Sequence, residues 1–153
     1  MSGPLTGVRV VAVDAQAGSA LRMAVLRPEQ DPAEPMYARE REPSTLHFAA
    51  LGAGGEVLAV GSIMPDGHPR GPRPGDWRVR GMATEPRERG RGLGALVLAA
   101  LEAAAREGGA RRLWCNARRP ARGFYERAGF IAEGEEFEIA GIGPHFVMAK
   151  PLG

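Results

Sequence analysis

The stretch between residues 77 and 117 places the strongest constraint on the fold. An apolar-patterned segment at residues 77–84 precedes a glycine-rich turn at 89–94. This turn opens a segment at 93–106 in which Leu93, Val97 and Leu101 recur at helical spacing. A second apolar run follows at residues 112–117. A strand, a helix and a strand in this order predict a βαβ unit, in which the strands are parallel and the crossover is right-handed.

The glycine-rich turn predicts an anion site. Residues 89–94 read Arg-Gly-Arg-Gly-Leu-Gly. Glycines let the backbone approach a ligand closely, and the first turn of a helix presents unpaired N–H groups. Arg89 and Arg91 add guanidinium groups that can pair with phosphate oxygens. The opposite interpretation is a tight turn with solvated arginines.

Two nucleotide-binding folds are tested against the same turn. A phosphate-loop triphosphatase is excluded, because no lysine follows the glycines. A dinucleotide-binding fold is disfavoured, because the strand at 112–117 ends around Asn116, where that fold carries an acidic residue. Several predicted strands also precede the turn, whereas the dinucleotide fold begins with it.

Further strands are predicted on both sides of this unit. They are expected at residues 8–13, 45–51 and 56–64 before it, and at 130–132, 137–139 and 145–150 after it. A glycine-rich hairpin at 52–55 joins two of them, and Gly81 predicts a bulge in the strand at 77–84. Helices are expected at 17–25, with Asp14 as a candidate cap, and at 121–128. Residues 28–44 are expected to form a long loop that holds one helical turn at most.

Composition fits one domain that covers residues 1–153. The apolar fraction of 44% and the charged fraction of 25% are ordinary for a globular protein, and no apolar run approaches the length of a membrane span. The single cysteine, Cys115, cannot form an internal disulfide, so a cytoplasmic location is expected. A net charge of +2 gives no reason to expect nucleic acid as a partner, and the aromatic stacking platform of such binders is missing.

Three segments at fixed spacing resemble a known family. Residues 77–86 read Trp-Arg-Val-Arg-Gly-Met-Ala-Thr-Glu-Pro, residues 89–94 match Arg-x-x-Gly-x-Gly, and residues 121–130 match Ala-x-x-Phe-Tyr-x-x-x-Gly-Phe. Together they resemble the GCN5-related N-acetyltransferases, and the chain end from Gly141 is similar to small bacterial members of the ElaA/YjcF type. The resemblance implies an α/β (α+β) fold: a mixed, largely antiparallel sheet of six to seven strands flanked by about four helices. It also implies a splayed parallel pair at residues 77–84 and 112–117.

The resemblance implies acetyl-CoA as the acyl donor and a primary amine of a small molecule or peptide as the acceptor, with no metal. Pantetheine would pair with the backbone of Met82 and Thr84, and an N–H near Ala83 would hold the thioester oxygen. The pyrophosphate would lie on the backbone of residues 90–95 beside Arg89 and Arg91. Further contacts to CoA are expected from Asn116 and Arg122. The cofactor-binding prediction therefore comprises Met82, Ala83, Thr84, Arg89, Gly90, Arg91, Gly92, Leu93, Gly94, Ala95, Asn116 and Arg122.

The resemblance places a catalytic acid at Tyr125, because a phenol can protonate the leaving thiolate. The base is less determined, since residues 77–84 hold no carboxylate. His145 is the first candidate, with His47, Glu85 and a bound water as alternatives. Cys115 lacks a neighbouring histidine or acid in sequence and is expected to be a buried, unreactive thiol.

The implied reaction is direct attack of the amine in a ternary complex. A noncatalytic CoA-binding or regulatory module on the same fold is the alternative, and a homodimer is compatible with the sequence. The acceptor itself is not encoded in any motif.

Overall fold

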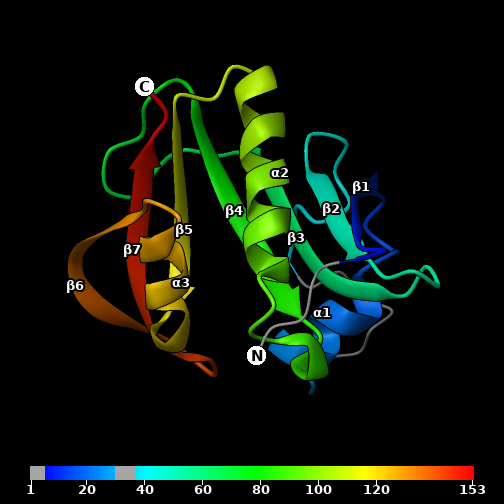
Figure 1. Cartoon of the computed structure of the whole chain (residues 1–153). Helices are drawn as coiled ribbons and strands as arrows, with labels where there is room; N and C mark the ends of the chain where they lie inside the picture. The colour runs from blue at the N-terminus through cyan, green and yellow to red at the C-terminus, as the bar shows by residue number, and fades with distance from the viewer. Residues whose placement is uncertain (1–5, 30–36) are drawn as a thin grey trace.

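The structure is a computed structural model that describes residues 6–29 and 37–153. A seven-stranded sheet with the order β1-β2-β3-β4-β5-β7-β6 forms its centre (Figure 1). All neighbouring strands are antiparallel except β4 and β5, which are parallel. The strands are β1 (Arg9–Val13), β2 (Leu46–Leu51), β3 (Val57–Pro65), β4 (Asp76–Thr84), β5 (Arg112–Arg118), β6 (Ile131–Ile139) and β7 (Gly143–Pro151). The predicted largely antiparallel sheet and its parallel pair are confirmed.

Helices cover both faces of this sheet. Within the described residues there are three α-helices, namely α1 (Ser19–Leu26), α2 (Leu93–Glu107) and α3 (Arg122–Arg127), and two 3-10 turns, η1 (Pro86–Glu88) and η2 (Arg119–Ala121). The prediction of about four α-helices is therefore slightly too high for this part of the chain. Residues 37–45 form only turns, and residues 30–36 of the predicted loop lie outside the described residues. No helix in the described ranges is both long and apolar enough to cross a membrane.

Two further local predictions are corrected. Asp14 does not cap α1, because its Oδ1 accepts the Ala17 N–H (3.0 Å) in the turn before the helix, whose N-cap is Gly18. Residues 130–132 and 137–139 are not separate fragments around an acidic turn. Residues 131–139 form one strand, β6, which begins after Phe130 and whose register against β7 shifts between Glu133 and Phe137. A bulge absorbs the extra acidic residues without ending the strand.

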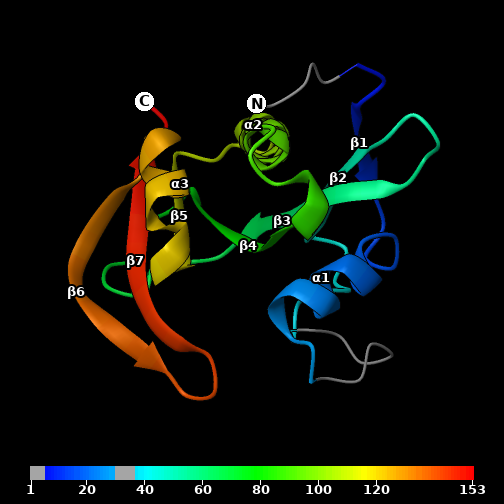
Figure 2. The same ribbon diagram turned by 60° about the horizontal axis from the view of Figure 1, so that its bottom comes forward.

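The two faces of the sheet have separate cores. Helices α2 and α3 lie on one face and α1 on the other (Figure 2). The larger core joins α2 and α3 to the sheet and is apolar throughout. Its fully buried members include Ile63, Val97, Leu101, Leu113, Cys115 and Met148. The smaller core holds Ala49, Val60 and Ala83 beneath Leu21 and Val25 of α1.

Strands β4 and β5 are paired at one end only. Their register comprises Asp76 with Arg112, Trp77 with Leu113, and Arg78 with Trp114, and it stops there although both strands continue. Figure 1 shows the two strands diverging toward the end of the sheet where α2 begins. The splayed pair predicted at 77–84 and 112–117 is thus present, and we call the unpaired part of β4 and β5 the split.

A bulge lies in β4 at the beginning of the split. Val60 pairs with Ala83 and Ser62 with Arg80, so Gly61 of β3 faces two residues of β4, Gly81 and Met82. Gly81 has φ +63°, a conformation that side chains rarely adopt. The extra residue reverses the alternation of β4, so that Val79 packs in the α2 core whereas Ala83 packs in the α1 core.

Candidate active site

The glycine-rich turn forms an open backbone concavity at the start of α2. Gly90 and Gly92 have φ of +83° and +82°, and a Cβ added at either position would meet nothing within 4 Å. Gly92 is the N-cap of α2 and no side chain caps this end, so the N–H groups of the first turn remain available to a ligand. Gly94 differs, because a Cβ there would lie 3.1 Å from the Phe124 ring and 3.6 Å from Thr84 Oγ1. The turn is therefore packed where it meets β4 and α3 and is open elsewhere.

The arginines near this turn have different surroundings. Arg89 is exposed, whereas Arg91 is half-buried and forms an ion pair with Glu88 of η1. Arg122 stacks on Phe146, with its Cζ 4.6 Å from the ring centroid, and pairs with Glu126 at 3.4 Å. Contacts of these arginines to CoA phosphates stay predictions.

The β4 residues predicted to bind pantetheine line the split. The bulge turns Met82 toward α2, where it packs against the larger core, and the neighbouring Ala83 faces α1. Thr84 lies beside Gly94. Because β5 forms no ladder with this part of β4, the edge of β4 is free for another partner.

Tyr125 lies on the α2 side of the sheet. Its ring packs edge-on against Phe124 (centroids 5.0 Å apart) and Phe130 (5.3 Å), and the residue is 6% exposed. Burial raises the pKa of Tyr125 well above its ordinary value of 10, and the Cys115 thiol raises it further. Tyr125 is therefore protonated at neutral pH and is a proton donor, not a base.

Cys115 has the surroundings of an unreactive thiol. It is 1% exposed in the larger core, and burial raises its pKa far above the ordinary value. Such a thiol stays protonated and is a poor nucleophile.

His145 and Asn116 lie on the opposite face from Tyr125. His145 is 4% exposed and pairs in register with Arg118 of β5. Its Nδ1 donates to the Gly143 carbonyl (2.8 Å), which leaves Nε2 as the acceptor of the neutral ring. Asn116 lines a pocket of about 250 Å³ with Pro69, Arg70, Phe137 and Val147, and its Oδ1 is buried without a partner. The face that carries α1 thus holds the candidate base, and we call it the acceptor face.

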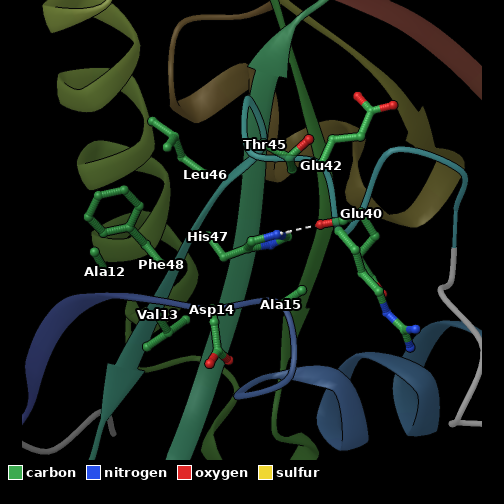
Figure 3. Close-up of a pocket in the computed structure, with 11 residues that line it drawn as sticks. Ala12, Val13, Asp14, Ala15, Glu40, Glu42, Thr45, Leu46, His47 and Phe48 are labelled. Carbon is green, nitrogen blue, oxygen red and sulfur yellow. Dashed lines mark hydrogen bonds between the residues drawn. The ribbon is translucent and has the colours of Figure 1, made fainter.

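His47, an alternative base, is part of a buried network instead. Its Nε2 donates to the Glu40 carbonyl (2.7 Å), as the dashed line in Figure 3 marks, so its Nδ1 accepts from the Ser62 hydroxyl (2.6 Å). Ser62 in turn accepts from Arg22 Nη2 (2.9 Å). With both ring nitrogens engaged, His47 has no free lone pair. Burial lowers its pKa, and the nearby Arg22 adds to this effect.

The pocket around His47 lies on β1 and β2, and β3 separates it from the β4 edge of the split. It has a volume of about 280 Å³ and is lined by β1, β2 and residues 40–45 (Figure 3). Strands β3 and β4 separate its floor from β5. Apart from His47 it contains none of the residues predicted to take part in acetyl transfer.

Arg22 is the residue that sequence reasoning missed. It is 1% exposed and donates to the Gly81 carbonyl through Nε (3.0 Å) and to Glu40 through Nη1 (3.1 Å), besides Ser62. It therefore ties α1 to the bulge beside the split. The only signal in the sequence was an arginine directly next to the apolar stripe of its helix.

Comparisons with known proteins agree with this geometry. A model of the acetyltransferase (GNAT) family matches residues 18–130. The uncharacterized N-acetyltransferase YitI of Bacillus subtilis (strain 168) is 32% identical over 132 residues, which cover 86% of this chain and 88% of YitI. Escherichia coli ElaA has the same fold, with a TM-score of 0.73 and 20% identity over 94% of this chain and 99% of ElaA. An aminoglycoside 6'-N-acetyltransferase complexed with coenzyme A gives a TM-score of 0.75 and 16% identity, with 94% and 96% of the two chains covered.

The fold and the split define an acetyltransferase architecture. The chain belongs to the GNAT acetyltransferase family, and the resemblance to its small bacterial members is confirmed.

Proposed function

We propose that this protein transfers the acetyl group of acetyl-CoA to a primary amine of a small molecule or peptide, by direct attack in a ternary complex. One observation carries the proposal: the glycine-rich turn, the unpaired edge of β4 and the protonated Tyr125 lie around a single split in the sheet. Family membership supports acyl transfer as the class of chemistry.

The described residues fit CoA. The turn at 90–95 combines open space at Gly90 and Gly92 with an uncapped helix start, which suits a pyrophosphate. The β4 edge at Met82 and Thr84 offers backbone groups that suit the amides of pantetheine. Bound acetyl-CoA would supply the activated acetyl thioester. The N–H predicted near Ala83 as donor to the thioester oxygen is proposed to be that of Met82 or Thr84. The Ala83 N–H itself points toward Val60 of β3, in the same ladder in which Glu85 N–H donates to the Leu58 carbonyl (2.8 Å).

Tyr125 is proposed as the general acid. Its raised pKa keeps the phenolic proton in place at neutral pH, and within the described residues its hydroxyl has no hydrogen-bond partner that would compete for this proton. Because only the protonated form donates, Tyr125 should impose no alkaline loss of activity below pH 10.

His145 is proposed to accept the proton of the amine, directly or through a water. The hydrogen bond from Nδ1 to Gly143 fixes the tautomer that leaves Nε2 basic. His145 and Tyr125 lie on opposite faces of the sheet, so that the acid and the base would serve opposite sides of the split.

Thiol release from acetyl-CoA with a panel of amines tests the proposal. Tyr125→Phe should lower kcat by about 10²-fold, whereas Cys115→Ala should retain turnover. His145→Gln, which removes the proposed proton acceptor, should also lower kcat by about 10²-fold. An unchanged kcat in Tyr125→Phe, or an acetylated enzyme in quenched-reaction mass spectrometry, would contradict the mechanism. Tight CoA binding without release of thiol by any amine would favour the noncatalytic alternative.

A further inference from the structure

The acceptor face carries three arginines beside the split. Arg78 and Arg80 project from β4 on this face, as their pairing with Met64 and Ser62 of β3 shows, and Arg118 lies at the end of β5. Arg78 is stacked on Trp114, with its Cζ 4.6 Å from the ring centroid. All three are half-buried. A long charged side chain in such a place is usually paired with a carboxylate.

Arg80 has no such partner within residues 6–29 and 37–153. It forms no ion pair or hydrogen bond there, and its guanidinium lies 4.3 Å from the centroid of the Tyr37 ring. Burial and the charges of Arg78 and Arg27 together lower its pKa to about 10, while Tyr37 and Asp66 act in the opposite direction. Stacking on an aromatic ring fixes the plane of a guanidinium and leaves its N–H edges available.

The neighbouring arginines are only partly neutralised. Asp66 Oδ2 is 3.6 Å from Arg78 Nη1, and its Oδ1 is 3.8 Å from Nη1 of Arg39, which also pairs with Glu42 at 3.0 Å. Arg78 Nε is buried without a partner.

Arg118 donates to a neutral group, the Leu26 carbonyl at the end of α1 (2.8 Å). Arg27 donates to the same carbonyl (3.3 Å). Burial and the charge of Arg27 lower the pKa of Arg118, and the carboxylate of Glu29, an exposed residue, acts in the opposite direction. Positive charge therefore exceeds negative charge on this part of the acceptor face.

We propose that Arg80, assisted by Arg78 and Arg118, binds an anionic oxygen group of the acceptor, so that the substrate is an amine that also carries a carboxylate or a phosphate. The inference rests on the proposed acetyl transfer. Arg80 lies just past the last β4–β5 pair and next to the bulge, on the face opposite the glycine-rich turn. It is thus separated from the proposed pyrophosphate site by the sheet itself.

The same charges disfavour polycationic acceptors. Two like charges at short range repel in a half-buried site more strongly than in bulk water. A polyamine or an aminoglycoside would bring several ammonium groups to a face that already has excess guanidinium groups. A free amino acid, which carries one ammonium and one carboxylate, is the smallest amine that suits a face with excess guanidinium groups.

Matched pairs of amines test the inference. Glycine is compared with glycinamide, and L-phenylalanine with phenethylamine, by thiol release from acetyl-CoA. Phosphoethanolamine with ethanolamine distinguishes phosphate from carboxylate, and spermidine represents polycations. We expect the anionic member of at least one pair to have a kcat/KM about 10- to 150-fold higher, the range for a hydrogen bond to a charged group. The ratio should fall as ionic strength rises.

Variants assign this preference to Arg80. Arg80→Gln should reduce the ratio within the preferred pair at least about tenfold through KM, whereas Arg80→Lys should keep part of it. Arg9→Gln, at an exposed arginine of β1 far from the split, is the matched control and should leave the ratio unchanged. Circular dichroism of each variant verifies folding. Equal use of both members of every pair, or an unchanged ratio in a folded Arg80→Gln protein, would overturn the inference.

Calorimetry separates this inference from the proposed reaction. The CoA-saturated protein is titrated with the same amines, so that binding is read without turnover. Tighter binding of the anionic members with no release of thiol would support the anion site and refute acetyl transfer. Turnover with equal affinity for both members of each pair would support acetyl transfer and refute the anion site.

Discussion

Replacement of Arg22 by methionine is the most demanding test of how the split is held. Arg22 donates to the Gly81 carbonyl (3.0 Å), the Glu40 carboxylate (3.1 Å) and the Ser62 hydroxyl (2.9 Å), and both it and Glu40 are almost completely buried. Methionine keeps the unbranched stem and removes all three donors. The variant therefore removes a hydrogen-bond donor to the Glu40 carboxylate, the Gly81 carbonyl and the Ser62 hydroxyl, which stay in the interior.

The expected loss of stability is large. Removal of one partner of a buried ion pair costs about 3–5 kcal/mol, because the other charge stays buried and loses its counter-ion. The lost hydrogen bonds to Gly81 and Ser62 belong to the same network and do not add in full. We expect the free energy of unfolding to fall by about 4 kcal/mol, which for a chain of this size lowers Tm by roughly 8–16 °C.

Urea unfolding followed by the fluorescence of Trp77 and Trp114 measures this loss. The midpoint should decrease with an unchanged slope, since a changed slope would indicate a changed denatured state. Glu40→Gln and the double variant complete a cycle. Because Glu40→Gln removes the charge whose counter-ion Arg22→Met deletes, the double variant should be more stable than the sum of the single losses predicts, by at least about 1 kcal/mol.

Arg9→Met is the control, since Arg9 is exposed and its loss should change stability by no more than about 0.5 kcal/mol. A loss below about 1 kcal/mol in Arg22→Met, or strictly additive single losses, would refute the assignment of Arg22 as the residue that ties α1 to the bulge.

Three further predictions concern stability alone. The folded protein lowers the pKa of His47, so the stability that its neutral form contributes is complete above pH 6.5 and is lost as the pH falls below 6.5; urea midpoints between pH 5 and 8 should show this dependence, and His47→Gln should abolish it. Asp76 has a pKa of about 2, because Arg112 and two backbone N–H groups outweigh the effect of burial; its contribution is present above pH 3.8 and is lost as the pH falls toward 2, and Asp76→Asn should flatten this part of the acid unfolding curve. Gly92→Ala should cost about 1–2 kcal/mol from its positive φ, since the space around it is open, and a loss above this range in thermal unfolding would indicate a clash that the structure does not contain.

Local signals explain which parts of the fold could be predicted. The turn at residues 52–55, the bulge at Gly81 and the N-terminus of α2 each depend on glycines within a few residues, and each is present. Helix α2 could likewise be predicted from the spacing of the apolar residues within its own segment. The family motifs identified Tyr125 as the candidate acid, and the fold packs its ring against Phe124 and Phe130; the catalytic role stays a prediction.

Long-range polar contacts explain what could not be predicted. Arg22 is buried because its partners come from positions 18, 40 and 59 residues away, and no local pattern brings them together. The same holds for His47, whose two ring nitrogens are engaged by Ser62 and Glu40. Its place in the strand predicted at residues 45–51 gave no sign of these hydrogen bonds, which are visible only in the folded protein.

The three-pair junction between β4 and β5 leaves two strand edges inside the sheet. Any edge with unpaired N–H and C=O groups invites a foreign strand, and proteins usually protect such edges at their rims. Here the protection is local: Gly81 interrupts the regular repeat of β4, and Arg80 and Arg118 place charge beside the opening. A regular peptide strand would meet a broken repeat and two cations, whereas a thin ligand needs only a few of the backbone groups. The bulge at Gly81 and the arginines beside the split thus also lower the risk that two copies of the protein associate by strand pairing at these edges.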